Sequence, residues 1–193
     1  GSPSFRQALA RFITYNHAQC ADRSKFPTAA ATAVHPDSLF VTNGASQGLA
    51  LLCKHFTRAG DTVLVENPTY FLATQTLRDH HVNIVGVDVD SGADGGVRVD
   101  ALAAAAAAHR PTLVYLIPSF HNPTGATLND AARAKLVRLA HQYRFVVACD
   151  DVYQMLWFDD AHRPPPAVVD YDNAAVLAAA AGDHDDDDDD GGG

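Results

Sequence analysis

Long apolar runs are absent from the sequence, and no stretch approaches the roughly 18 consecutive apolar residues that a membrane-spanning helix needs. A membrane partner is therefore not expected. Cysteine is scarce as well, since Cys20, Cys53 and Cys149 are odd in number, widely spaced and set among apolar neighbours. This pattern argues against a disulfide framework and indicates reduced, mostly buried thiols. We expect a cytoplasmic protein.

An excess of positive charge is also missing, because 23 Asp and Glu residues stand against 14 Lys and Arg residues. Seven of the acidic residues lie in residues 182–193, so the rest of the chain is nearly neutral, with 16 acidic residues against 14 basic ones. A protein without a basic patch is not expected to bind nucleic acid. His80 and His81 are adjacent but have no further ligand at a useful spacing, so we expect no metal site.

The length bounds the domain organisation, since 193 residues are enough for one domain with a sizeable core and short for two. We expect a helical lead-in over residues 1–38 and a main domain over residues 39–181. Six consecutive Asp residues repel one another, which predicts a disordered tail over residues 182–193. The chain begins with Gly1, which indicates either a cloning remnant or a lost upstream segment, so organellar targeting stays open.

Strand-like and helix-like segments alternate along the chain, which predicts a three-layer α/β/α sandwich around a mostly parallel sheet. Strands are predicted over residues 39–42, 62–66, 82–89, 113–117 and 145–149. Helices are predicted over residues 5–20, 47–56, 70–78, 101–108 and 127–143.

Two helix starts carry capping signals. Asp100 is predicted to cap the fourth helix, and Thr127 with Asp130 resembles a capping box for the fifth. The apolar positions of the fifth helix predict that Leu136, Leu139 and Ala140 are buried. Its basic residues are predicted to face water, and they are Arg133, Lys135 and Arg138.

Polar residues follow two of the predicted strands, where ligands bind in an open α/β sheet. After residues 113–117, Pro118 ends the strand, and the loop that follows carries His121 and Asn122. Asp150, Asp151 and Tyr153 follow the strand over residues 145–149 in the same way. Earlier in the chain, a strand, a Gly-containing turn and a helix start aim backbone N–H groups at an anion, although such a turn can also be a plain connection.

Four segments in this order carry a family resemblance: TNGASQGL at residues 42–49, ENPTYF at 66–71, SFHNPTG at 119–125 and VVACDDVYQML at 146–156. The chain resembles the class I/II aminotransferases, which are pyridoxal-phosphate enzymes of fold type I. It is most similar to the subgroup that includes the 2-aminoadipate and kynurenine aminotransferases. The resemblance covers nearly everything from Pro3 to about Phe158.

The resemblance implies a pyridoxal 5'-phosphate site. It assigns the cofactor phosphate to the backbone of Ala45 and Ser46 and to the Ser46 hydroxyl, although many relatives have Ser-Gln here, so one hydroxyl contact is expected to be absent. It implies that Tyr70 stacks on the ring and that Asp150 keeps the ring nitrogen protonated. Asn122 and Tyr153 would donate hydrogen bonds to the phenolate oxygen, Asp151 would be an exposed neighbour of Asp150, and His121 a supporting residue.

The resemblance also implies a lysine that binds the cofactor covalently and acts as a general base. The sequence contains only Lys25, Lys54 and Lys135, and none lies in a matching S-x-x-K segment after Tyr153. The arginine that binds the substrate carboxylate in the family is missing as well. We therefore expect a piece of a large domain, truncated at both ends and inactive alone.

Three interpretations stay open at this point. The first is part of an aminotransferase that acts on an amino acid and a 2-oxo acid, as a homodimer in its full-length relatives. The second is a lyase or synthase of the same fold, similar to the aminocyclopropane-carboxylate synthases. The third is a non-catalytic chain that associates with a full-length relative.

Overall fold

The computed structural model describes residues 1–20, 33–90 and 95–173, and these form a sheet of five strands in the order β3-β2-β1-β4-β5. The predicted acidic tail and Lys25 lie outside the described residues. Strands β2, β1, β4 and β5 are parallel, and β3 is antiparallel to β2, so the predicted mostly parallel sheet is confirmed. The strand bounds are Thr62–Asn67 for β1, Asn83–Asp90 for β2, Gly96–Val97 for β3, Leu113–Leu116 for β4 and Val146–Cys149 for β5.

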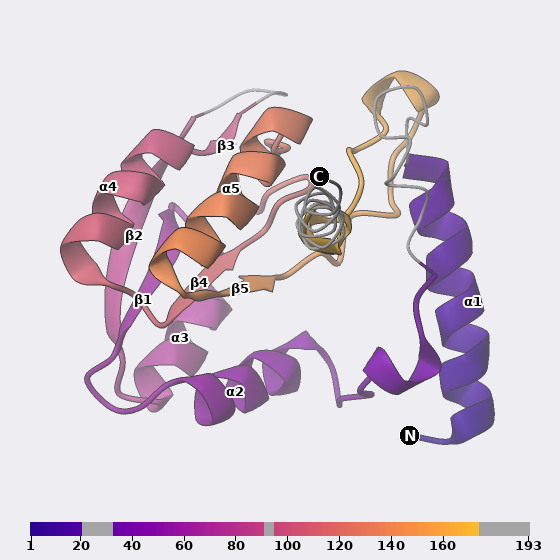
Figure 1. The fold of residues 1–193 in the computed structure, drawn as a ribbon, viewed down its shortest axis with the longest axis horizontal. Coiled ribbons are helices and arrows are strands. Elements are labelled where there is room, and N and C mark those ends of the chain that lie inside the picture. Colours follow the sequence, from indigo (N-terminus) through magenta and orange to yellow (C-terminus); the bar gives the residue numbers. More distant parts are fainter. Residues whose placement is uncertain (21–32, 91–94, 174–193) are drawn as a thin grey trace, which may run out of the picture.

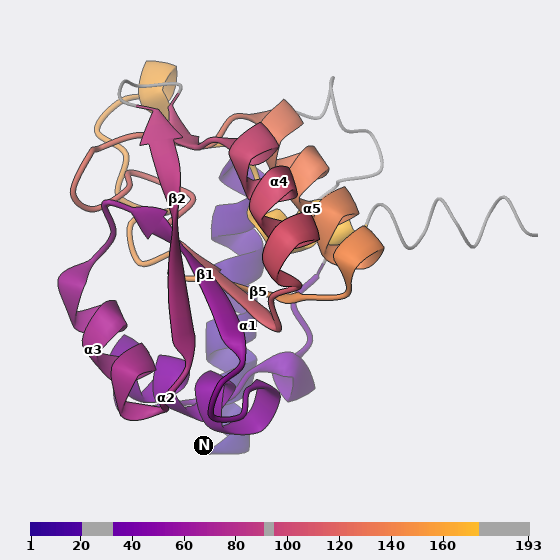
Figure 2. The ribbon, with the colours of Figure 1, turned by 90° about the vertical axis from the view of Figure 1, so that its left-hand side faces the viewer.

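Helices cover both faces of the sheet, as Figure 2 shows. Helices α2 and α3 lie on one face and α4 and α5 on the other, so the three-layer sandwich is confirmed. The helix bounds are Pro3–Cys20 for α1, Ala45–Phe56 for α2, Phe71–Asp79 for α3, Val99–His109 for α4 and Asp130–Tyr143 for α5. Among the described residues, no helix is long and apolar enough to cross a bilayer.

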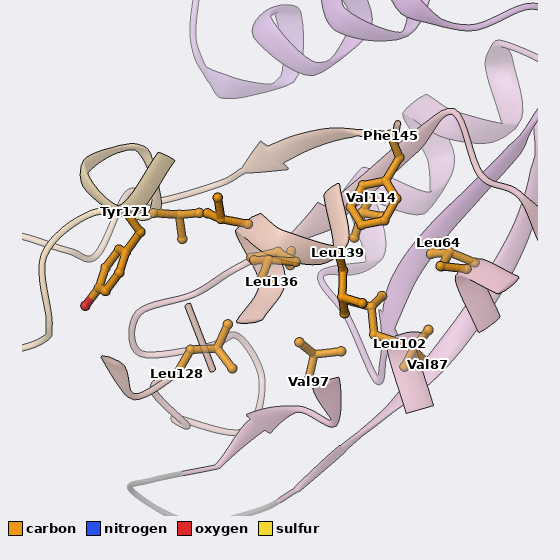
Figure 3. Packing of buried hydrophobic residues seen from close by; sticks show 14 residues of the cluster. Leu64, Val87, Val97, Leu102, Val114, Leu128, Leu136, Leu139, Phe145 and Tyr171 are labelled. Carbon is orange, nitrogen blue, oxygen red and sulfur yellow. The ribbon is translucent and has the colours of Figure 1, made fainter. Parts of the chain in front are cut away.

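The central strands are apolar on both sides because each side packs against its own helices. Leu64 and Val114 of the strands meet Leu102 of α4 and Leu136 of α5 in the cluster of Figure 3. The neighbours of Leu64 in β1 point the opposite way and pack against Cys53 of α2 and Leu77 of α3. Burying each such Leu side chain contributes about 1.5–3 kcal/mol.

Helix α1 lies to one side of the sheet, beside the C-terminal part of the chain (Figure 1). The Arg6 guanidinium donates to the Pro36 carbonyl at 3.0 Å, and the Arg163 guanidinium donates to the Gln19 carbonyl near the other end of α1. Polar contacts at both ends therefore hold this helix in place.

Residues 39–42 are not a strand, contrary to the prediction. The segment follows the short 3-10 helix η1 (Pro36–Ser38) and leads directly into the turn before α2. Phe40 is 80% exposed, because the segment pairs with no strand in the described part of the chain. An apolar segment becomes a strand only where a neighbour accepts its backbone hydrogen bonds.

Both predicted caps are wrong. The N-cap of α4 is Arg98, and the Asp100 side chain binds Lys135 instead. The N-cap of α5 is Asn129, whose side chain accepts the Ala132 N–H at 2.9 Å. The Thr127 hydroxyl is already used, because it accepts the backbone N–H of Phe120 at 3.0 Å.

Arg133 does not face water as predicted but is fully buried. Its guanidinium donates to four oxygens at 2.9–3.0 Å. These acceptors are the carbonyls of Leu128, Pro166 and Pro118 and the hydroxyl of Ser119. Inward-facing carbonyls need donors, and a guanidinium carries five N–H groups, which is why this side chain is buried.

The cysteines follow the prediction in part. Cys20 and Cys53 are buried thiols, whereas Cys149 at the end of β5 is exposed. Because β5 pairs only with β4 in the described part of the chain, its outer side lacks the cover that a central strand has.

Candidate functional site

The carboxyl ends of β1, β4 and β5 lie at the same edge of the sheet, because these strands are parallel. Tyr70 follows β1, Asn122 follows β4, and Asp150 follows β5 directly. The fold thus brings three of the predicted site residues to one edge, where ligands bind in open α/β sheets.

Asp150 accepts a hydrogen bond from Tyr115, with 2.8 Å between the phenol oxygen and Oδ2. Tyr115 is opposite Ala148 in the β4–β5 register, and Asp150 is two residues further on, so all three side chains point to the α2 face. Burial, reinforced by the negative charge of Asp150, raises the pKa of Tyr115 far above its usual value. The phenol therefore stays protonated and acts as the donor.

A cavity of about 190 Å³ lies beside this pair. Its walls come from the start of α2 and from the ends of β4 and β5. The lining residues are Ala45, Gly48, Leu49, Leu52, Tyr115, Ala148, Cys149 and Asp150. Two predicted site residues, Ala45 and Asp150, thus line one cavity although they lie far apart in the sequence.

The start of α2 is suited to binding an anion. Gly44 is its N-cap with φ 83°, a conformation that a residue with a Cβ rarely adopts, and the Gly44 carbonyl accepts the Gly48 N–H. The N–H groups of Ala45 and Ser46 have no acceptor within the helix, and both residues are exposed. These free donors, with the helix dipole, favour a negatively charged ligand at this end.

The loop after β4 is held by a buried Glu–His pair. Glu66 Oε2 accepts the Ile117 N–H at 2.8 Å and lies 3.1 Å from His121 Nε2. The other ring nitrogen of His121 lies 2.8 Å from the Thr124 hydroxyl. Because both Glu66 and His121 are fully buried, His121 supports the loop beside Asn122 and does not reach solvent.

A second set of contacts joins this loop to the segment after β5. The Ser119 hydroxyl donates to Gln154 at 2.6 Å, and the Gln154 amide donates to the Pro165 carbonyl at 2.8 Å. The loop that carries Asn122 and the segment that carries Tyr153 are therefore tethered to each other.

The other predicted cofactor-binding residues do not line this cavity, and they are Ser46, Tyr70, Asn122 and Tyr153. Tyr70 and Tyr153 are half-buried and pack against the core between the sheet and α2 and α3. Asp151 is not the exposed neighbour that the sequence predicted, because it is half-buried and its Oδ1 is buried. Burial raises the pKa of Asp151, and the positive charge of Arg133 opposes that change.

The sequence model of the family described as "Aminotransferase class I and II" matches residues 1–181. The chain belongs to this family. The 2-aminoadipate transaminase of Thermus thermophilus is 36% identical to it over 131 residues, which are 68% of this chain and 32% of that protein. The predicted family and subgroup are therefore confirmed.

Two solved structures of fold type I aminotransferases share the fold. Kynurenine aminotransferase from Pyrococcus horikoshii has 32% identity and a TM-score of 0.62, over 68% of this chain and 33% of that one. The α-aminoadipate aminotransferase LysN from Thermus thermophilus, complexed with N-(5'-phosphopyridoxyl)-L-leucine, has 31% identity and a TM-score of 0.65, over 88% of this chain and 39% of that one. This class I/II aminotransferase chain thus spans about a third of the length of such relatives.

Several residues that build the site of this aminotransferase chain were not found from the sequence. Tyr115 had a signal, because a buried Tyr in an aliphatic strand needs a partner for its hydroxyl. The burial of Arg133 also had a signal in the sequence, because Arg133 lies three residues before Leu136 and therefore on the same, buried face of the helix. The Glu66–His121 contact had none, because the two residues lie 55 positions apart.

Proposed function

We propose that this chain forms the cofactor-binding part of a pyridoxal-phosphate-dependent aminotransferase, which transfers an amino group between an amino acid and a 2-oxo acid. The observation that carries the proposal is the Asp150 carboxylate at the carboxyl end of β5, in a cavity that the start of α2 also lines. The full-length protein is proposed to be a homodimer, by likeness to its family.

The residues present fit the cofactor by their chemistry. The free N–H groups of Ala45 and Ser46 suit a phosphate, and a carboxylate such as Asp150 suits a protonated pyridine nitrogen. Half-buried Tyr70 offers a flat ring for stacking, and Asn122 and Tyr153 offer donors for a phenolate oxygen. When bound, pyridoxal phosphate supplies an electron sink for the substrate's developing carbanion.

The part played by the chain's own groups is binding and proton control. Asp150 holds a proton at the ring nitrogen by a charge-assisted hydrogen bond. The start of α2 fixes the phosphate and thereby the orientation of the ring. Neither Lys54 nor Lys135 lines the cavity, since Lys54 is exposed on α2 and Lys135 binds Asp100. We infer that these 193 residues bind the cofactor but do not catalyse transfer by themselves.

A titration with pyridoxamine 5'-phosphate tests the proposal, because this form of the cofactor needs no lysine to bind. Asp150→Asn removes the negative charge, and affinity is expected to fall about 10- to 100-fold, the size of a hydrogen bond to a charged group. Pyridoxamine without its phosphate is expected to bind more weakly than the phosphate ester. Fluorescence of the bound ring gives the dissociation constants.

Asp130→Asn is the matched control, because Asp130 also accepts a tyrosine hydroxyl, from Tyr171 at 2.6 Å, but lies outside the cavity. Its affinity for pyridoxamine phosphate is expected to equal that of the unchanged chain. An equal loss of affinity for pyridoxamine phosphate in Asp150→Asn and Asp130→Asn would contradict the proposed function. So would the absence of binding by the unchanged chain.

A further inference from the structure

Among the residues that the structure describes, two tyrosines donate to aspartates, and one of these bonds lies in the candidate site. Tyr115 donates to Asp150 at 2.8 Å, and Tyr171 donates to Asp130 at 2.6 Å. Both phenols are buried, with 2% and 7% of their surface exposed. The bonds are alike in chemistry, but Tyr115 and Asp150 line the cavity and the other pair does not.

The backbone holds Tyr115 and Asp150 in a fixed relation. Tyr115 is in the middle of the sheet, paired with Val65 on one side and Ala148 on the other. The Asp150 N–H donates to the Leu116 carbonyl at 2.9 Å, which extends the β4–β5 ladder up to the carboxylate itself. The hydrogen bond between the side chains is therefore aligned by the sheet.

The rest of the Asp150 side chain is available to a ligand. Tyr115 is the one protein donor to this carboxylate among the residues that the structure describes, and it uses Oδ2. Asp150 is half-buried and lines the cavity, and no described residue donates to its second oxygen. A carboxylate has about four lone-pair sites, so one donor leaves the group able to accept another.

We propose that Tyr115 is a positioning residue for Asp150, holding one carboxylate oxygen so that the other faces the ring nitrogen of pyridoxal phosphate. The inference rests on the proposed function and adds a residue to it that the family resemblance did not supply. Tyr115 touches the carboxylate, and it acts on the cofactor through Asp150.

Two physical effects follow from this hydrogen bond. It restricts rotation of the carboxylate, which lowers the entropy lost when a ligand binds. It also fixes the direction of the second oxygen, which would align the charge-assisted hydrogen bond to the ring nitrogen and so favour the protonated ring. Removing the hydroxyl is therefore expected to weaken binding and to lower the protonated fraction of the ring nitrogen.

Tyr115→Phe removes the hydroxyl and keeps the ring in the core. With pyridoxamine 5'-phosphate as the probe, affinity of the 193-residue chain is expected to fall about 3- to 10-fold, the size of one hydrogen bond. The ¹⁵N chemical shift of the labelled ring nitrogen is expected to move toward that of neutral pyridine. A purely structural role would not change this shift.

Tyr171→Phe is the matched control and is expected to leave both the affinity and the ¹⁵N shift unchanged. In an Asp150→Asn background, Tyr115→Phe is expected to have little further effect, because the two residues act through one interaction. An additive effect in the double variant would overturn the proposal.

The outcomes separate the two hypotheses. If the unchanged chain and Tyr115→Phe bind the probe equally and show the same ¹⁵N shift, the role of Tyr115 is wrong and the proposed function stands. If the unchanged chain does not bind pyridoxamine 5'-phosphate, both the role of Tyr115 and the proposed function are wrong. Should Tyr115→Phe not fold, 3-fluorotyrosine at position 115 gives a stronger donor of nearly the same shape, and unchanged affinity in that protein would overturn the proposal.

Discussion

Asp150 and Asp151 are adjacent, yet their surroundings give them different properties. Asp150 receives the Tyr115 hydroxyl at the edge of a cavity. Asp151 points to the opposite side of the strand end, near Arg133, and its Oδ1 is buried without a hydrogen-bond partner among the described residues. One carboxylate thus lines the cavity beside α2, and the other lines a separate cavity on the α5 side of the sheet.

Asp151 should make the stability of the chain fall as pH rises. Burial raises its pKa above the ordinary value of 3.8, so the folded chain binds this proton more tightly than the unfolded chain does. Between the ordinary and the raised pKa, the free energy of unfolding therefore decreases with increasing pH. In Asp151→Asn this decrease is expected to be smaller than in the unchanged chain.

Urea unfolding at a series of pH values from about 4 upward measures this difference. Asp90→Asn is the control, because Asp90 is exposed at the end of β2. An unfolding free energy that varies with pH in the same way in Asp151→Asn and in the unchanged chain would contradict the prediction.

Among the elements, helix α5 covers the sheet and also stabilises the loop after β4. Through Arg133 it donates to the Pro118 and Leu128 carbonyls, which lie at the two ends of the loop after β4. The same guanidinium reaches the Pro166 carbonyl, so a single side chain joins helix, loop and C-terminal segment. The position of Asn122 in that loop therefore depends on a helix that does not line the site.

Replacing this buried donor should destabilise the protein strongly. Arg133→Met is expected to lower the free energy of unfolding by about 3–5 kcal/mol, because several buried carbonyls lose their donor at once. Arg138→Met, on the exposed side of the same helix, is expected to change it by less than about 0.5 kcal/mol. Urea unfolding followed by circular dichroism gives the free energy of unfolding of both variants. A similar decrease in Arg133→Met and Arg138→Met would contradict the prediction.

At the scale of the molecule, the described residues form a three-layer sheet with the candidate cofactor site at one edge, and neither Lys54 nor Lys135 lines the cavity there. We therefore expect no covalent cofactor adduct in the isolated 193-residue chain. Pyridoxal phosphate is added, the mixture is treated with borohydride, and modified lysines are mapped by mass spectrometry, with a full-length aminotransferase as the positive control.

Transamination is expected to be undetectable in the same preparation, since a positioned general base typically contributes about 10²- to 10⁴-fold to such reactions. A stoichiometric adduct on Lys25, Lys54 or Lys135 together with measurable transamination would show that the chain is catalytically complete.

Much of the fold followed from local patterns. The central strands and the helices that cover them were predicted within a few residues, because burial on two faces and helical periodicity are both visible in short windows. The strand predicted at residues 39–42 was wrong because this segment finds no pairing partner in the described part of the chain, and pairing with a distant segment is not visible in a local pattern. The family followed from four motifs in order, and the roles of Ala45, Ser46, Tyr70, Asn122, Asp150 and Tyr153 stay predictions.

The sequence by itself determined the order of the elements, the family, and which residues follow the carboxyl ends of the parallel strands. Only the tertiary structure decided that Tyr115 donates to Asp150, that Glu66 meets His121, and that Arg133 is buried. The physical reason is that periodicity depends on neighbours a few residues apart, whereas a buried polar side chain depends on partners from distant segments. Such partners become defined only when the strands are in register and the helices are packed on them.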